Sequence, residues 1–202
     1  MIIRIATVFV AGAMLAACSQ PEPAVDKTPA PAASAESPAP KVGPVAPPTT
    51  KEEMVKSALA AAPEEVSKDA AVMAMDAGKM TVLKEGTNGW TCMPDGPSPG
   101  VDPMCLDKNG LEWAHAWMEH KAPPKDKMGF GYMLQGGSDA SNTDPFATAP
   151  KESGQWVDTG PHVMVLNIGD RFAGYPTTPD NTKSPYVMFP NTPYAHLMIP
   201  VR

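Results

Sequence analysis

The segment around Cys18 sets the limits of what this chain can fold into. One basic residue, Arg4, precedes an uncharged, mostly apolar stretch that runs from residue 5 to residue 17. This stretch is too short to span a bilayer comfortably, because a spanning helix needs about 20 residues. Its length, and the small residues before the cysteine, are typical of a secretory signal peptide. We therefore expect residues 1–17 to be a cleaved signal and the folded part to lie beyond them.

The four residues Leu15-Ala16-Ala17-Cys18 resemble the lipobox of bacterial lipoproteins. The resemblance implies that Cys18 is lipidated and becomes the acylated N-terminus, with palmitate among its modifications. Two or three acyl chains anchor a protein stably, whereas one chain binds a membrane only marginally. Residue 19, directly after the cysteine, is serine and not aspartate. In lipoproteins of this type, the resemblance therefore implies sorting to the outer membrane, where the protein faces the periplasm or the cell surface. An ordinary secretory signal with a chance cysteine is the alternative.

Residues 19–50 are rich in proline and alanine and contain no aromatic residue. Such a segment cannot bury enough apolar surface to offset the entropy lost on ordering. We expect residues 18–50 to be the lipidated cysteine and a disordered tether that extends at about 3.1 Å per residue. The tether is either a simple spacer or a means of reaching peptidoglycan or an envelope protein. Residues 51–202 then form a single globular domain.

The chain carries a net charge of −6, and 43% of its residues are hydrophobic. An acidic chain lacks the basic footprint that nucleic-acid binding requires, so we expect no nucleic-acid partner. The expected partners are the membrane, through the lipid anchor, and an envelope protein or peptidoglycan.

Two cysteines remain once Cys18 is lipidated, Cys92 and Cys105. Export places them in an oxidising compartment, where paired thiols form disulfides. A disulfide here closes a loop of about 14 residues, worth roughly 3 kcal/mol on the loop-entropy model. A metal pair or a redox site needs closer spacing or more ligands, so a structural disulfide is the favoured prediction.

The pattern of apolar residues predicts an α+β domain with a largely antiparallel sheet of about six strands and two helices. The helices are expected at residues 51–62, after a capping box at Thr50-Lys-Glu-Glu53, and at 108–120, after Asp107 as N-cap. The segment 162–168 is apolar on both faces and should be a central strand. The expected strands are 70–75, 80–83, 127–134, 162–168, 186–189 and 195–201, and a turn at residues 86–92 is expected to feed one further short strand.

Two of these strands carry the same short motif, His162-Val-Met164 and His196-Leu-Met198. Residues i and i+2 of a strand share a face, so each motif presents an imidazole beside a thioether. If the strands are neighbours, two histidines and two methionines could converge. Such soft ligands suit copper, especially Cu(I), which is the candidate cofactor. Methionine also fills gaps in ordinary cores, and that remains the alternative.

A second candidate site is the polar loop from Gly136 to Pro145. Its oxygen donors are Ser138, Asp139, Ser141, Asn142 and Asp144. Long loops in compact domains are often functional. The loop lacks the ligand spacing of an EF-hand and the G-x-S-x-G nucleophile elbow. A network of Asx and Ser turns is the alternative.

Five short segments together resemble a group of exported bacterial proteins with no assigned activity, and the likeness covers most of residues 66–202. The segments are Thr87-Asn-Gly-Trp90-Thr-Cys92, Asp102-Pro-Met-Cys105, Tyr132-Met-Leu-Gln-Gly-Gly-Ser-Asp-Ala-Ser141, Gly160-Pro-His-Val-Met164 and Pro193-Tyr-Ala-His-Leu-Met-Ile-Pro200. The resemblance brings no catalytic residues with it.

The sequence therefore favours a non-enzymatic envelope module that binds a small ligand, a copper-type metal or an envelope partner. The alternative is a small periplasmic hydrolase that uses His162 or His196 with the Gly136–Pro145 loop. No H-E-x-x-H, P-loop or dinucleotide fingerprint occurs in the sequence.

Overall fold

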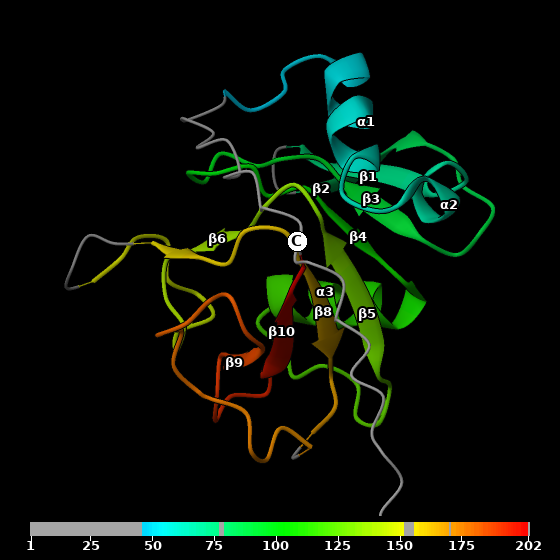
Figure 1. Ribbon diagram of the computed structural model, residues 1–202. Coiled ribbons are helices and arrows are strands. Elements are labelled where there is room, and N and C mark those ends of the chain that lie inside the picture. The colour runs from blue at the N-terminus through cyan, green and yellow to red at the C-terminus, as the bar shows by residue number, and fades with distance from the viewer. Residues whose placement is uncertain (1–45, 77–78, 152–155, 170, 202) are drawn as a thin grey trace, which may run out of the picture. The chain divides into compact units, whose positions relative to one another are not determined.

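A single eight-stranded sheet organises the domain in the computed structural model (Figure 1). The structure describes residues 46–76, 79–151, 156–169 and 171–201, all of them within the compact unit Pro40–Arg202. The predicted signal, Cys18 and most of the tether lie outside the described residues.

The sheet has the strand order β2-β1-β3-β4-β5-β8-β10-β9, and β6 and β7 form a separate two-stranded sheet. Every neighbouring pair is antiparallel except β1 with β3. The strands are β1 (Ala71–Asp76), β2 (Lys79–Lys84), β3 (Thr91–Met93), β4 (Met104–Leu106), β5 (Gly129–Met133), β6 (Ser138–Asp139), β7 (Val157–Asp158), β8 (His162–Leu166), β9 (Tyr186–Met188) and β10 (His196–Pro200). The helices are α1 (Lys51–Leu59), α2 (Glu64–Ser67) and α3 (Lys108–Met118).

The broad α+β class agrees with this architecture, but the expected numbers of elements were too low. The main sheet has eight strands rather than six, and the described residues contain three helices rather than two. The additional strands β4, β6 and β7 are only two or three residues long, too short to show a periodic pattern. The predicted central strand at residues 162–168 is confirmed as β8, which lies between β5 and β10, but it ends at Leu166, because Asn167 adopts a left-handed backbone conformation.

Helix α1 covers one face of the sheet over β1 and β3 (Figure 1). It begins with the predicted capping box, in which the Thr50 hydroxyl accepts from the Glu53 N–H and the Glu53 carboxylate accepts from the Thr50 N–H. Its buried residue Ala58 packs against the disulfide between Cys92 and Cys105. Helix α1 is thus part of the domain core.

The Cys92–Cys105 disulfide confirms the predicted pairing. The two cysteines lie directly opposite each other on the antiparallel strands β3 and β4, and both are fully buried. The disulfide therefore joins the two ends of the turn-rich segment between the cysteines. Strand β4 begins at Met104, just before the second cysteine.

Helix α3 packs on the opposite face. Asp107 caps it as predicted, accepting from the Gly110 N–H at 2.7 Å. A Cβ atom on Gly129 of β5 would overlap the backbone of Gly110, so this pair of glycines lets the helix approach the sheet closely. Cys105 contributes to the core under α1, whereas the next residue, Leu106, contributes to the core under α3, as alternation along a strand requires.

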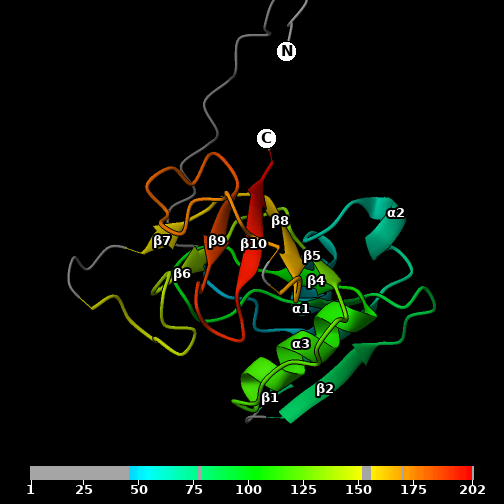
Figure 2. The ribbon, with the colours of Figure 1, turned by 90° about the horizontal axis from the view of Figure 1, so that it is seen from below.

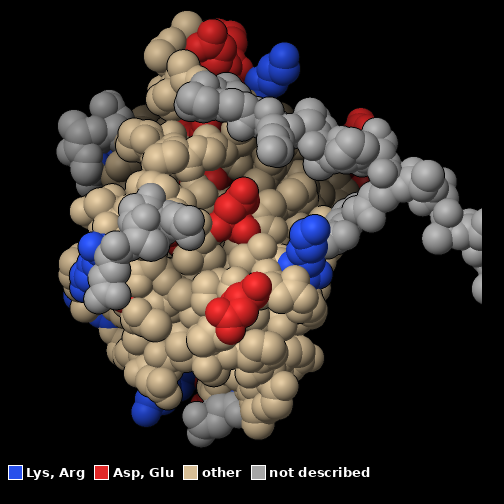
Figure 3. Space-filling view, turned by 60° about the vertical axis from the view of Figure 1, so that its left-hand side comes forward, with Lys and Arg blue, Asp and Glu red and all other residues tan. Residues whose placement is uncertain are grey.

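The face of the described domain seen in Figure 3 is mostly uncharged and carries only a few scattered acidic and basic side chains. Within the described part of the chain, no helix combines the length and apolar character needed to cross a membrane.

Candidate functional site

Strands β8 and β10, which carry the two His-x-Met motifs, are hydrogen-bonded neighbours (Figure 2). Their register places Met164 directly opposite Met198. Because alternate residues share a face, His162 and His196 lie on the same face as this methionine pair. All four side chains are buried. We call this surface, which is packed in the core under α3, the His–Met face.

The flanking strands extend the His–Met face with two further buried methionines. Met133 of β5 lies opposite His162, and Met188 of β9 lies opposite His196. Each histidine therefore has one methionine across the strand and a second two residues along its own strand. Met133 and Met188 could not be assigned to the site from the sequence, because they join it only through the pairing of strands that are distant in the chain.

His162 is fully buried, and its two ring nitrogens have different environments. Nδ1 lies 2.7 Å from the carbonyl oxygen of Gly160, which only accepts, so Nδ1 carries the proton in this contact. Nε2 is then a lone-pair acceptor, and it is buried without a hydrogen-bond partner among the described residues. Burial lowers the pKa of His162 below its usual value, which keeps the imidazole neutral.

His196 repeats this arrangement on β10. Its Nδ1 lies 2.9 Å from the carbonyl oxygen of Tyr194, again two residues earlier in the chain. The rings of Trp113 and Phe189 meet the imidazole edge-on, with centroids at 5.2 and 5.5 Å. Burial lowers the pKa of His196 to about 4, with a smaller contribution from charge on His162.

The two histidines do not lie side by side. His196 is opposite Leu166, four residues along β8 from His162, which corresponds to about 13 Å along the strand. The Met164–Met198 pair lies between them. The strands thus bring together one methionine pair with an imidazole on each side of it. Among the described residues, no three or more His, Cys, Asp or Glu side chains lie close enough together to hold a metal ion. This statement does not cover the thioethers of methionine.

The predicted ligand groups of the Gly136–Pro145 loop mostly make hydrogen bonds within the loop and to neighbouring segments. The Ser141 hydroxyl accepts from the backbone N–H groups of residues 143 and 144. The side chain of Asn142 donates to the carbonyl oxygens of Thr177 and Val187. The carboxylate of Asp144 accepts from the N–H of residue 146 and from Lys151. These contacts match the alternative of a turn network.

Ser138 and Asp139 form β6, next to the His–Met face. The Ser138 hydroxyl contacts the Asp102 carboxylate and the carbonyl oxygen of Pro99. Among the described residues, no serine or threonine hydroxyl is hydrogen-bonded to His162 or His196, as a hydrolytic dyad would need. Burial raises the pKa of Asp139 to about 7, and the neighbouring charge of Asp102 adds to the effect.

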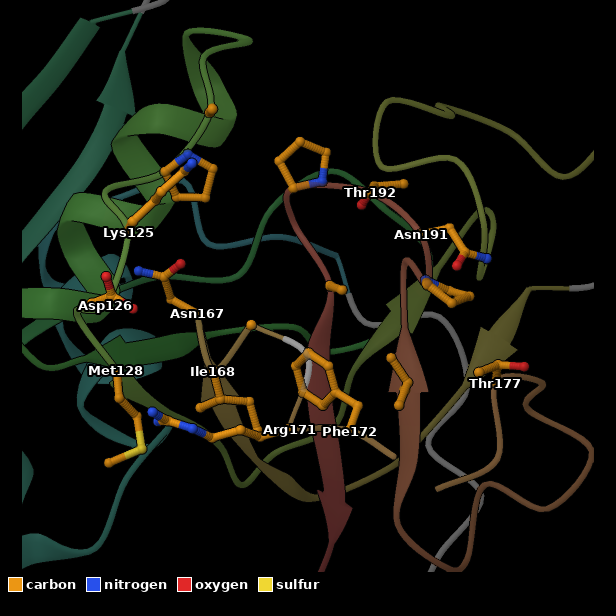
Figure 4. Close-up of a pocket in the computed structure, with 17 residues that line it drawn as sticks. Lys125, Asp126, Met128, Asn167, Ile168, Arg171, Phe172, Thr177, Asn191 and Thr192 are labelled. Atoms are coloured by element: carbon orange, nitrogen blue, oxygen red, sulfur yellow. The ribbon is translucent and has the colours of Figure 1, made fainter. Parts of the chain in front are cut away.

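A cleft of about 960 Å³ opens elsewhere on the domain, bounded by loops that the sequence analysis did not single out (Figure 4). Val187, which alternates with Met188 of the His–Met face, contributes to its lining. Three lining residues, Asp126, Asn167 and Asn191, have left-handed backbone conformations. The cleft carries charges of both signs, from Lys125, Arg171 and Asp126, so its lining favours no single class of ligand.

Comparison of the chain with models of protein families, with curated proteins and with solved structures gave no match.

The contact between Gly137 and His162 provides a first test of this geometry. A Cβ atom at residue 137 would overlap Cε1 of His162, so we expect Gly137→Ala to lower the free energy of unfolding by about 1–3 kcal/mol. Gly96→Ala is the matched control, because its Cβ atom would meet nothing within 4 Å. Urea denaturation of both variants would check the prediction. Equal stabilities would contradict the close packing of residue 137 on the imidazole.

The low pKa of His196 predicts a specific dependence of stability on pH. In the unfolded chain this histidine takes up a proton near its usual pKa of 6.5, but in the folded protein only near 4. The stability that the neutral ring provides is therefore complete above about pH 6.5 and is lost progressively as the pH falls toward 4. By about pH 5 the loss should reach about 2 kcal/mol.

His196→Gln removes this linkage, so the cost of the substitution should be about 2 kcal/mol smaller at about pH 5 than at about pH 7.5. Chemical denaturation at the two pH values measures the difference. Asp139 has a raised pKa, so its contribution to stability changes with pH in the opposite direction. This contribution is present in both the variant and the wild type and therefore cancels in the difference between them. Leu197→Ala, on the other face of β10, should cost the same at both values. A cost of His196→Gln that does not change with pH would contradict a neutral buried ring.

Proposed function

We propose that this chain is a lipid-anchored protein of the bacterial cell envelope whose domain is a non-enzymatic binding module for a soft metal ion, Cu(I). The observation that carries the metal proposal is Nε2 of His162. This nitrogen is buried, has no hydrogen-bond partner among the described residues, and belongs to a ring on the same sheet face as Met164 and Met198.

The chemistry of the donors supports Cu(I) rather than a hard cation. A metal-binding histidine must be neutral, and its other ring N–H is usually fixed by a carbonyl or carboxylate. Both histidines of the His–Met face meet these conditions through their bonds to Gly160 and Tyr194. Thioether sulfur is a soft ligand that selects Cu(I), whereas Mg²⁺ and Ca²⁺ prefer oxygen. Burial also keeps oxygen donors of bulk water away from the ion.

The spacing of the strands favours His162 as the nitrogen ligand, with sulfur from the methionine pair. A bonded ion lies about 2 Å from an imidazole nitrogen. The two histidines are separated by about 13 Å along the strand, so one ion cannot bind both unless each ring leans toward the methionines. His196 then flanks the pair from the other side, where Trp113 and Phe189 hold its ring.

The envelope part of the proposal rests on the sequence alone. The lipobox at Leu15–Cys18, the serine after it and the proline-rich tether support an outer-membrane lipoprotein, and all but the last five residues of this segment lie outside the described part of the chain. The resemblance to exported bacterial proteins supports the same location. An oxidising envelope also accords with the Cys92–Cys105 disulfide.

Anaerobic titration with Cu(I) in competition with a chromophoric Cu(I) chelator tests the metal proposal. We expect the wild-type domain to withdraw the metal from the chelator. The double variant Met164→Leu with Met198→Leu should lose the one Cu(I) ion that is bound by both nitrogen and sulfur. Leucine keeps the volume of methionine but removes both thioethers. Such swaps usually cost less than about 1.5 kcal/mol, so the variant should fold.

Met128→Leu is the matched control, since this methionine is exposed and lies outside the His–Met face. X-ray absorption should show nitrogen and sulfur ligands in the wild-type complex and loss of the nitrogen signal in His162→Gln. Cu(I) binding by the double variant with the affinity, stoichiometry and ligand set of the wild type would contradict the proposal.

Labelling with radioactive palmitate in a bacterial host tests the anchor. The wild-type chain should incorporate the label and fractionate with the outer membrane. Cys18→Ala removes the acceptor thiol, so it should abolish incorporation and shift the protein away from the outer membrane. Ser19→Asp should keep the label but change the membrane fraction. Labelling of the Cys18→Ala protein would contradict lipidation at this residue.

A further inference from the structure

A second group of methionines lies on the hairpin formed by β1 and β2, at one edge of the sheet. The antiparallel register places Met75 directly opposite Met80, and Met73 opposite Val82. Directly opposed residues share a face, as do residues two apart on one strand. Met73, Met75 and Met80 therefore project from the same side of the hairpin. We call these three residues the hairpin methionines.

This side of the hairpin faces away from the core under α1. The alternating residues Val72 and Ala74 are buried on the α1 side, which leaves the hairpin methionines on the other. Met75 is 51% exposed and its neighbour Val82 is 47% exposed. Met73 and Met80 are partly exposed. The sulfur atoms thus belong to side chains that solvent reaches, in contrast to those of the His–Met face.

The spacing of the three side chains suits a shared ligand. Directly opposed residues have Cβ atoms about 4.5–5.5 Å apart, and diagonal neighbours are about 7–8 Å apart, within reach of long side chains. Methionine is unbranched and has three rotatable bonds, so three thioethers on this face can turn toward one point. Thioethers carry no proton to lose, and as soft ligands they favour Cu(I) over the hard cations Mg²⁺ and Ca²⁺.

We propose that Met73, Met75 and Met80 form a solvent-accessible, sulfur-only binding site for Cu(I), separate from the His–Met face. The inference shares the soft-metal chemistry of the proposed function but stands on different residues. An exposed site can exchange its metal directly with solvent or a carrier, which a fully buried site cannot do without opening of the fold. The hairpin is thus suited to first capture of the ion.

The paired variant Met75→Leu with Met80→Leu separates metal binding from a purely apolar role. Leucine keeps the apolar surface and the approximate volume of methionine but supplies no sulfur. A hairpin that only docks a protein partner through apolar contact would keep its surface in this variant. A hairpin that binds Cu(I) would lose its site. Met128→Leu again serves as the control for loss of an exposed methionine.

The experiment uses protein labelled with carbon-13 in the methionine methyl groups and Cu(I) supplied anaerobically from a weak chelator. In the wild type we expect the methyl resonances of the hairpin methionines to shift as Cu(I) is added. In Met75→Leu with Met80→Leu we expect the remaining Met73 signal to stay unshifted and the stoichiometry to fall by one equivalent. Met128→Leu should behave like the wild type.

Comparing the hairpin variant with the double variant of the His–Met face distinguishes the two proposals. Met164→Leu with Met198→Leu should keep the hairpin shifts and the sulfur-only X-ray absorption signal, even if the His–Met face binds no metal. Conversely, failure of the hairpin methyl groups to shift in the wild type would overturn the hairpin site. Unchanged stoichiometry in Met75→Leu with Met80→Leu would also overturn it, whatever the His–Met face does.

Discussion

The antiparallel pairing of β8 with β10 is the contact on which the arrangement of the candidate site depends. These strands lie side by side in the sheet, with β5 attached to one and β9 to the other. Their register sets Met164 against Met198 and turns both histidines toward the core under α3. A slip of one residue would move each of these side chains to the opposite face of its strand. The His–Met face is therefore a property of the pairing and of no single segment.

This dependence explains how far the sequence could predict the structure. Local signals identified the caps at Thr50 and Asp107, and the two cysteines of an expected exported domain predicted the disulfide. The apolar pattern found β9 and the longer strands, but β4, three residues at the end of a turn-rich segment, shows too little of the pattern to be recognised. Met133 and Met188 join the site only through pairing between distant segments, which a sequence pattern does not contain.

The two groups of methionines differ in a way that bears on metal exchange. The His–Met face is held in a packed core, so its donors are pre-organised but an ion reaches them only when the fold opens locally. The hairpin methionines are on an exposed two-stranded ribbon, where fewer contacts hold the side chains and the ion can arrive directly. With Cu(I) at both proposed sites, the chain would combine fast capture at the surface with retention in the core.

The buried imidazole of His162 is the feature that an apolar core explains least well. Burying a polar group without a hydrogen bond costs about 1–3 kcal/mol in proteins, and here Nδ1 is bonded but Nε2 has no partner among the described residues. A leucine or methionine would fill a similar space without that cost. Met133, Met164 and Met198 already occupy the surrounding positions, so the site does not require a polar residue to complete its packing. A bound Cu(I) would use the Nε2 lone pair and offset this cost. The presence of a destabilising histidine at this position is therefore a reason to expect a ligand there.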